Sequence, residues 1–302
     1  MDNSDSKLKL EDLGAPKKSA ASVTVRRVIA YVVLILLTIL CLIWFYILFI
    51  NATRSNGDLS RGFRAYPSDR LLVNLNNIFH GSLPVVRGMI NSLIVAGLTA
   101  LLTTYFSTMT AYAIHAFRFK GRKAIFVFIL AIMMIPTQVS ALGFQQLCYS
   151  WGLVNSFIPL IVPSIASAVV FFYMKQYMDS NLPHELLEAA RIDGAGEIRI
   201  FNTIVIPLMK PAIAVQAIFA FVGSWNNYFI PSLILHKDEM KTLPILIAQL
   251  RAADYLKFDM GQVYASIAFS IFPVIIVYLL LSRYIVGGVT AGSVKGYKLL
   301  LP

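Results

Sequence analysis

The chain of 302 residues is mainly apolar, because 58% of its residues are hydrophobic and only 14% are charged. Such a composition leaves too little polar surface for an ordinary soluble domain and indicates an all-α, polytopic integral membrane protein. The formal net charge of +11 also suggests a nucleic-acid partner, but the basic residues are scattered over separate segments rather than gathered in one patch, so we expect none.

The first 27 residues are rich in Ser, Lys and Asp, which predicts a disordered cytosolic tail. Residues 28–286 form the predicted transmembrane domain, since they contain six apolar runs that can each cross about 30 Å of hydrocarbon. The first run is expected to stay as an anchor, because it ends in aromatic residues rather than a small-residue cleavage site. The six predicted spans are 28–50, 88–117, 124–144, 157–177, 212–235 and 263–286.

The distribution of Lys and Arg predicts the orientation of these spans. With the N-terminus inside, the inner segments hold 17 of these residues and the outer segments hold nine. Cytoplasmic segments of membrane proteins carry such an excess. Both termini, the connection 178–211 between spans four and five, and the tail 287–302 are therefore predicted to lie in the cytoplasm.

Prolines within the apolar runs predict interrupted helices. Pro136, Pro159 and Pro163 should break or kink their spans, and the carbonyl groups that they free must be satisfied by neighbours or by a water-lined cavity.

The inner connection 178–211 is predicted to contain a short helix. Pro183 and Glu185 suit a first helical turn, and Gly194 suits a left-handed residue that ends the helix. A second short helix is expected at 196–205. Glu188 and Arg191 share a face, while Ala189 and Ala190 leave the backbone accessible to a partner.

The outer segment 236–262 is long for a connector and contains a second predicted helix. Leu243, Leu246 and Leu250 stand beside Gln249 and Arg251, a pattern typical of a short amphipathic helix. One interpretation is a lid packed on its own subunit, and another is a contact with a partner outside the membrane.

The absence of certain residue types from the spans limits the possible transport mechanisms. The spans carry ionisable residues only near their edges, at Arg87, His115, Lys175 and Arg283. Proton- and ion-coupled transporters keep such residues inside the membrane for function. No Gly is followed by Lys, so the chain lacks a phosphate-binding loop. We expect a transport subunit rather than an enzyme, with no metal or cofactor of its own.

Uncharged hydrogen-bonding and aromatic side chains in the spans are candidates for a path that a neutral polyhydroxylated solute would follow. Small polar residues in spans also hold helices together, and the Trp225–Tyr228 group could instead form an interfacial aromatic belt. The candidates are Asn91, Gln138, Trp225, Asn226, Asn227 and Tyr228.

Three motifs carry a family resemblance that covers most of the chain from about residue 25. Glu188-Ala189-Ala190, with Gly194 and the later Ile206-Pro207, resembles the "EAA" loop of permease subunits from ABC importers. The segments 223–227 and 292–296 resemble the maltose-type, carbohydrate-uptake branch of that family.

The resemblance implies a set of partner contacts. In that family the loop docks into a groove on an ATPase subunit, and the C-terminal tail extends towards the ATPase dimer. The coupling residues would be Glu188, Ala189, Ala190, Arg191, Asp193 and Gly194, and the tail residues would be Gly292, Lys295 and Gly296.

The resemblance also implies the assembly and its cargo. The chain would be part of a sugar or oligosaccharide importer in a bacterial plasma membrane. Its partners would be a second permease that forms a heterodimer with it, two ATPase subunits that use ATP and Mg²⁺, and an extracytoplasmic solute-binding protein that the outer loop reaches. Alternatives are the same type of permease for a non-sugar solute, an ion-coupled secondary transporter, and a membrane scaffold without transport.

Overall fold

The computed structural model describes residues 20–81, 83–252 and 259–297, with side chains from residue 25 to residue 285. These residues contain helices and no strand, as the composition predicts. Most of the predicted tail 1–27 and part of the outer segment 236–262 lie outside the described residues.

Five stretches are long and apolar enough to cross a membrane, and a sixth is added if the bent pair α5 and α6 counts as one span. The helices of these stretches are α1 (Ala20–Ala52), α4 (Val85–Ala116), α5 (Arg122–Ile132), α6 (Thr137–Ser150), α7 (Ile158–Ile161), the 3₁₀ turn η1 (Val162–Ala166), α8 (Ala168–Asn181), α10 (Glu197–Ile200), the π turn η2 (Phe201–Val205), α11 (Ile206–Trp225) and α14 (Met260–Tyr297).

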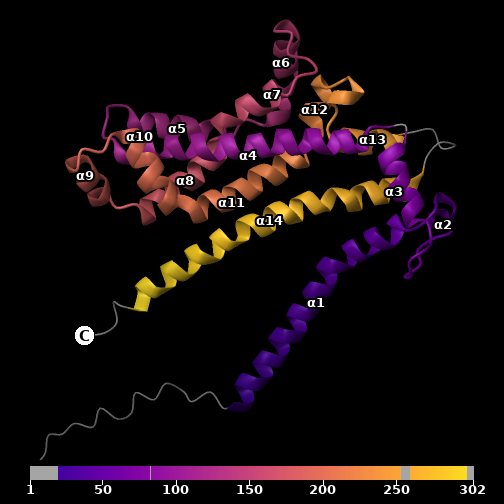
Figure 1. The fold of residues 1–302 in the computed structure, drawn as a ribbon. Helices are drawn as coiled ribbons and strands as arrows, with labels where there is room; N and C mark the ends of the chain where they lie inside the picture. Colours follow the sequence, from indigo (N-terminus) through magenta and orange to yellow (C-terminus); the bar gives the residue numbers. More distant parts are fainter. Residues whose placement is uncertain (1–19, 82, 253–258, 298–302) are drawn as a thin grey trace, which may run out of the picture.

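The predicted third span is not one straight helix. Its two halves, α5 and α6, meet at 92°, and Pro136 is the residue that begins α6, with an extended backbone. Pro159 and Pro163 likewise lie in the short α7 and in η1 rather than inside a regular helix. A proline ring removes one backbone donor and clashes with the preceding turn, so these helices break where proline predicts. In Figure 1, α6 projects away from α4.

The predicted fifth span has different limits. It ends at Trp225, and Phe229–Ile234 form a separate helix, α12. It also begins earlier, because the short helix predicted at 196–205 continues through η2 into α11. The wider π turn directly precedes Pro207, where a regular turn would bring the proline ring against the carbonyl of residue 203.

Helix α4 is the centre of the bundle. It packs against α8, α11, η1 and α13, and Figure 1 shows α8 and α11 alongside it. At one end lies the short helix α9 (His184–Ile192). At the other end lie α2 (Asn56–Ser60), α3 (Leu71–His80) and α13 (Leu243–Ala252), with the turn η3 (Asp238–Met240).

Helix α13 is the amphipathic helix predicted in the outer segment. Its residues Leu243, Ile245 and Leu246 are buried, and the helix packs against α4 and α14. These contacts support the interpretation of a helix packed on its own subunit.

Helix α1 is attached to the bundle at its outer end. Over the rest of its length it diverges from the other helices (Figure 1), and only 6% of its most apolar window is buried. At the outer end the Asn74 side chain donates to the carbonyl oxygens of Ala52, at 2.8 Å, and Arg54, at 3.0 Å. Gly261, at the start of α14, packs so closely that a Cβ atom there would lie 2.1 Å from the Arg54 oxygen.

This close approach predicts that Gly261→Ala destabilises the protein. The added methyl group would push α14 away from the end of α1, and overpacking of this kind costs about 1 to 3 kcal/mol. Thermal unfolding of the purified protein measures the effect. Gly97→Ala in α4 is the matched control, since a Cβ atom there meets nothing within 4 Å and alanine favours a helix. Equal melting temperatures for the two variants would contradict the tight joint.

Candidate functional site

The inner helix α9 has the limits that the sequence predicts. Pro183 caps its start, Glu185 lies in its first turn and Arg191 in its last. The left-handed Gly194, with φ of +78°, follows the C-cap residue Asp193. The Gly194 amide donates to the Arg191 carbonyl and the Ala195 amide donates to the Ala190 carbonyl, both at 3.0 Å. This paired arrangement is a Schellman motif, which ends a helix sharply.

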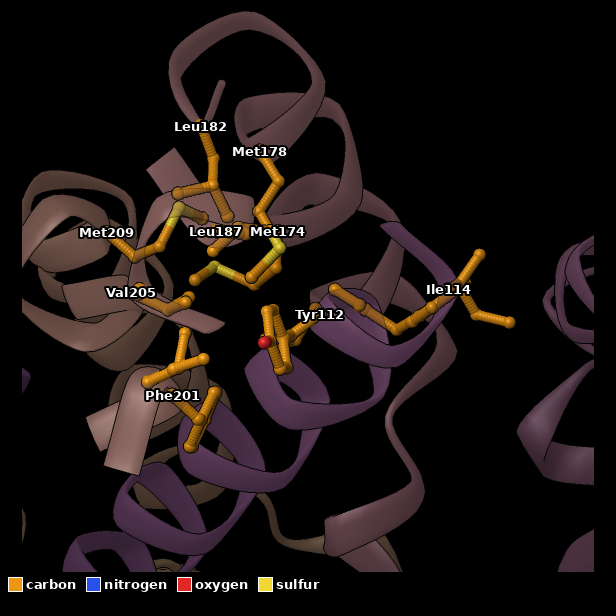
Figure 2. Close-up of a cluster of buried hydrophobic side chains, with 14 residues drawn as sticks. Tyr112, Ile114, Met174, Met178, Leu182, Leu187, Phe201, Val205 and Met209 are labelled. Carbon is orange, nitrogen blue, oxygen red and sulfur yellow. The ribbon is translucent and has the colours of Figure 1, made fainter. Parts of the chain in front are cut away.

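The inward side of α9 packs on a hydrophobic cluster. Leu187 is fully buried and Ala190 is nearly so, among side chains from α4, α8, η2 and α11 (Figure 2). Ala190 therefore does not leave its backbone open to a partner, as the sequence suggested, because its methyl group points into this cluster. Figure 2 shows Leu187 beside Met174, with Val205 and Met209 close by.

Arg191 is also engaged within the subunit. Its Nε donates to Glu197 Oε1 at 2.7 Å, and the same carboxylate accepts a hydrogen bond of 2.6 Å from the Tyr112 hydroxyl. The guanidinium group lies over the Phe117 ring, 5.3 Å from its centroid. The hydrogen bond that Arg191 donates to the Glu197 carboxylate raises the pKa of Arg191. Arg191 thus attaches α9 to α4 and α10. The sequence did not identify Glu197 as the partner of Arg191.

The outward side of α9 and the turn after it form an exposed surface, which we call the coupling face. It contains Glu188, Ala189, Ile192, Asp193 and Ile198. Ile192 and Ile198 are 86% and 77% exposed, although both are large and apolar. Glu188 forms no hydrogen bond or ion pair with any residue that the structure describes. Neither isoleucine was among the coupling residues predicted from the sequence, because hydropathy does not distinguish them from the buried apolar residues of the same connection.

The path candidates separate into different environments. Asn91 is buried, and its amide donates to the carbonyl oxygens of Glu239 and Lys241 at 2.8 and 2.9 Å, which holds the outer segment on α4. Trp225 is buried and stacks on Phe221 with ring centroids 5.7 Å apart. Gln138 is exposed near the start of α6. The structure therefore does not bring the six candidates into one site.

Asn227 lines a cavity of about 260 Å³ between α4, α6, α7, η1, α11 and α12. We call it the hydroxyl cavity. Its lining contains no charged side chain, and the Thr242 hydroxyl is buried there without a hydrogen-bond partner among the described residues. The polar side chains of the lining are Ser92, Thr137, Ser140, Ser224, Asn227 and Thr242.

A second, larger cavity lies beside α13 and the end of α11. It has a volume of about 650 Å³, and Trp225, Asn226 and Tyr228 contribute to its lining together with Arg251. The sequence grouped Trp225 to Tyr228 as one site. The end of α11 at Trp225 turns the chain, so Asn227 faces the hydroxyl cavity and its two neighbours face the larger one.

The tail residues Gly292, Lys295 and Gly296 fall within α14, which continues to Tyr297. Their side chains lie outside the described ones.

The left-handed turn predicts that Gly194→Ala weakens the end of α9. A side chain at this φ costs about 1 to 2 kcal/mol, and nothing within 4 Å would compensate or clash. Amide hydrogen exchange in residues 190–195 should become faster by about tenfold. Gly196→Ala is the control, since Gly196 has an ordinary φ of −70° and equally open surroundings. If both variants exchange like the wild type, the turn is not under this constraint.

Comparison with known proteins identifies relatives for most of the chain. The family of binding-protein-dependent transport system inner membrane components matches residues 106–290. The arabinooligosaccharides transport system permease protein AraQ of Bacillus subtilis (strain 168) is 34% identical over 90% of this chain and 97% of its own length. The sn-glycerol-3-phosphate transport system permease protein UgpE of Yersinia pestis bv. Antiqua (strain Antiqua) is 31% identical over 86% of this chain and 95% of its own length.

A solved structure shares the fold. It is a bacterial ABC transporter involved in the import of the acidic polysaccharide alginate, and it matches with a TM-score of 0.75 and 23% identity over 89% of this chain and 99% of the other. The matched family region includes α9, the coupling face and α11. The chain belongs to the family of binding-protein-dependent transport system inner membrane components and is a membrane-spanning permease subunit.

Proposed function

We propose that the coupling face docks on the ATPase subunit of an ABC importer and moves the spans as a rigid lever. The exposed Ile192 in α9 and Ile198 in α10 support this proposal, because a protein contact would remove these two large apolar side chains from water. Glu188 and Asp193 would supply polar contacts at the rim, and the exposed Ala189 would permit close approach. Arg191 and Gly194 would shape the face from behind.

The attachment of α9 supports the lever. The hydrophobic base at Leu187 and Ala190 and the Arg191–Glu197 ion pair join α9 to α4, α8 and α11. A push on α9 would therefore tilt these spans together. Alternating access by such rigid-body movement fits a heterodimer with a second permease, two ATPase subunits that use ATP and Mg²⁺, and an external solute-binding protein.

We place α9 and both termini on the cytoplasmic side of the plasma membrane. The excess of Lys and Arg in the inner segments supports this orientation. The elements α3 and α13 would then face the solute-binding protein, and α1 would contact lipid or the second permease.

The cargo that the lining of the hydroxyl cavity favours is a neutral sugar or oligosaccharide. Uncharged hydroxyl and amide groups that converge in a cavity suit a polyhydroxylated solute, and the unpartnered Thr242 hydroxyl carries this conclusion. The name of AraQ supports the same class.

A second candidate cargo is an anionic solute. Arg251 lines the larger cavity, and the relative UgpE is named for sn-glycerol-3-phosphate. An arginine can bind a phosphate through two parallel hydrogen bonds.

The deciding experiment measures ATP hydrolysis by the co-purified complex in lipid vesicles, with its solute-binding protein and a panel of neutral oligosaccharides and sn-glycerol-3-phosphate. Stimulation by one class of oligosaccharide supports the proposal. Stimulation by sn-glycerol-3-phosphate alone would show that the cargo is anionic. If no compound stimulates hydrolysis, the proposal that the protein imports either kind of cargo is refuted.

The coupling face predicts that Ile192→Ser weakens assembly with the ATPase. Burial of an isoleucine side chain contributes about 1.5 to 3 kcal/mol, so the yield of co-purified ATPase and the stimulated hydrolysis should fall at least tenfold. Leu72→Ser in α3 is the matched control for the yield of co-purified ATPase, because Leu72 is 78% exposed at the opposite end of the bundle. A loss of ATPase that is equal in both variants would point to general instability instead.

The hydroxyl cavity predicts that Thr242→Val impairs transport of the sugar. Valine has the same shape but cannot hydrogen-bond, and one such bond contributes about 1 kcal/mol, so the uptake efficiency should fall by roughly fivefold at an unchanged melting temperature. Thr99→Val is the control. The Thr99 hydroxyl is also buried without a partner among the described residues, but Thr99 does not line this cavity. Normal uptake by Thr242→Val would show that the hydroxyl cavity is not part of the transport path.

A further inference from the structure

The N-terminal end of α9 is attached to the spans by a buried histidine. His115 lies in the last turn of α4 and is 4% exposed. Its Nδ1 is 2.9 Å from Asp179 Oδ1 in α8, and its Nε2 is 3.0 Å from the Leu182 carbonyl oxygen. Leu182 directly precedes Pro183, the residue that caps α9. One imidazole ring therefore bridges α4, α8 and the entry to α9.

The two partners of this ring define its protonation state. A carbonyl oxygen and a carboxylate oxygen are both acceptors, so both ring nitrogens must donate. A neutral imidazole carries a proton on one nitrogen and would turn the lone pair of the other towards an oxygen. Asp179 is held as a carboxylate by the ammonium group of Lys175, which donates to both of its oxygens. The bridge is therefore complete when His115 is an imidazolium.

The surroundings of the bridge contain further titratable and charged groups. The His184 ring, at the start of α9, stacks on the His115 ring with centroids 4.4 Å apart and planes 4° from parallel. Burial lowers the pKa of His184, and the positive charges of His115, Arg118 and Arg122 lower it further, while Glu185 acts in the opposite direction. A neutral His184 ring presents its face to the imidazolium, which is the favourable arrangement for a cation. The His115 ring contacts Asp179 and His184, and Lys175 holds the same Asp179 carboxylate. The further charged groups that act on the neighbouring His184 ring are Glu185, Arg118 and Arg122.

We propose that protonated His115 is a positioning residue that fixes the start of α9 to the spans, so that transport per ATP hydrolysed depends on cytoplasmic pH. When the proton is lost, one of the two hydrogen bonds is lost with it. The end of α9 at Arg191 stays attached, but its start can move independently of α4 and α8. The ATPase then moves α9 without moving the spans to the same extent.

The direction of the pH dependence follows from the charged form. The bridge is formed by the imidazolium, so its contribution is present where His115 carries two ring protons and is lost when one of them leaves at higher pH. Histidine changes charge within the physiological range. Coupling should therefore be tight in mildly acidic cytoplasm and become looser as the cytoplasm becomes alkaline.

The experiment uses the complete importer in vesicles and varies pH on the ATPase side from about pH 5 to about pH 8. Transport per ATP hydrolysed is measured at each pH, together with amide hydrogen exchange in residues 182–192, corrected for the intrinsic rate at each pH. In the wild type, exchange should become about tenfold faster at the upper end, as expected for the loss of one hydrogen bond to a charged group, and the transport ratio should fall.

Two variants and one control separate the bridge from other effects. In His115→Gln the ratio should be independent of pH. Asp179→Ala, which removes the hydrogen-bond partner of Nδ1, should show the loose, high-pH behaviour at every pH. His80→Gln, in the outer helix α3, should keep the wild-type profile. If amide exchange in the wild type does not change with pH, the proposal is overturned even if the variants do not assemble. The proposal is also overturned if the transport ratio of His115→Gln depends on pH as that of the wild type does. An importer that hydrolyses no ATP with its cargo contradicts the proposed function instead.

Discussion

The attachment of α9 to the membrane helices is the contact on which the rest of the structure depends. A short helix outside the membrane has marginal stability by itself, so its orientation must come from packing. Leu187 and Ala190 provide an apolar base, and the Arg191–Glu197–Tyr112 hydrogen bonds hold the far end against α4 and α10. The sharp turn at Gly194 lets the chain return directly into α10. Helix α10 continues through η2 into α11, so the ion pair between Arg191 and Glu197 attaches α9 directly to the start of a span.

In a membrane, a helix can expose apolar side chains to lipid without the energetic cost that exposure to water would have. In water, the exposed apolar surface of α1 would be costly, but lipid tails are as apolar as leucine. The helix can therefore stay at the edge of the bundle, fixed through its outer end by Asn74 and by the contact of Gly261 with Arg54. Helix α4 has the opposite character, since its small and polar residues let α8 and α11 approach closely. The Thr103 and Ser107 hydroxyls illustrate this, because they donate to carbonyl oxygens of Ser164 and Ser167.

Local signals in the sequence predicted much of this architecture. The limits of α9, the left-handed Gly194 and the break at Pro136 follow from capping and proline chemistry, which act within a few residues. The partners of Arg191 and the burial of Ala190 could not be predicted in the same way. Glu188 lies one turn from Arg191, but the acceptor that Arg191 uses, Glu197, is positioned by the turn between α9 and α10 and by Tyr112, which is distant in the sequence. The end of α11 was missed because residues 212–235 are mainly apolar on both sides of Trp225, and hydropathy does not register a change of helix direction.

The polar residues of the spans were ambiguous for a physical reason. Every buried polar group needs a partner, and a sequence does not say whether that partner is protein or cargo. Asn91 is satisfied by two carbonyl groups of the outer segment, whereas the Thr242 hydroxyl is not satisfied by any described residue. The hydroxyl cavity is lined by Pro159, Pro163 and Pro231, which lie in the first turns of the short helices α7, η1 and α12. Straight helices would close this space by packing side chain against side chain, so the prolines, which are visible in the sequence, locate the cavity better than the polar residues do.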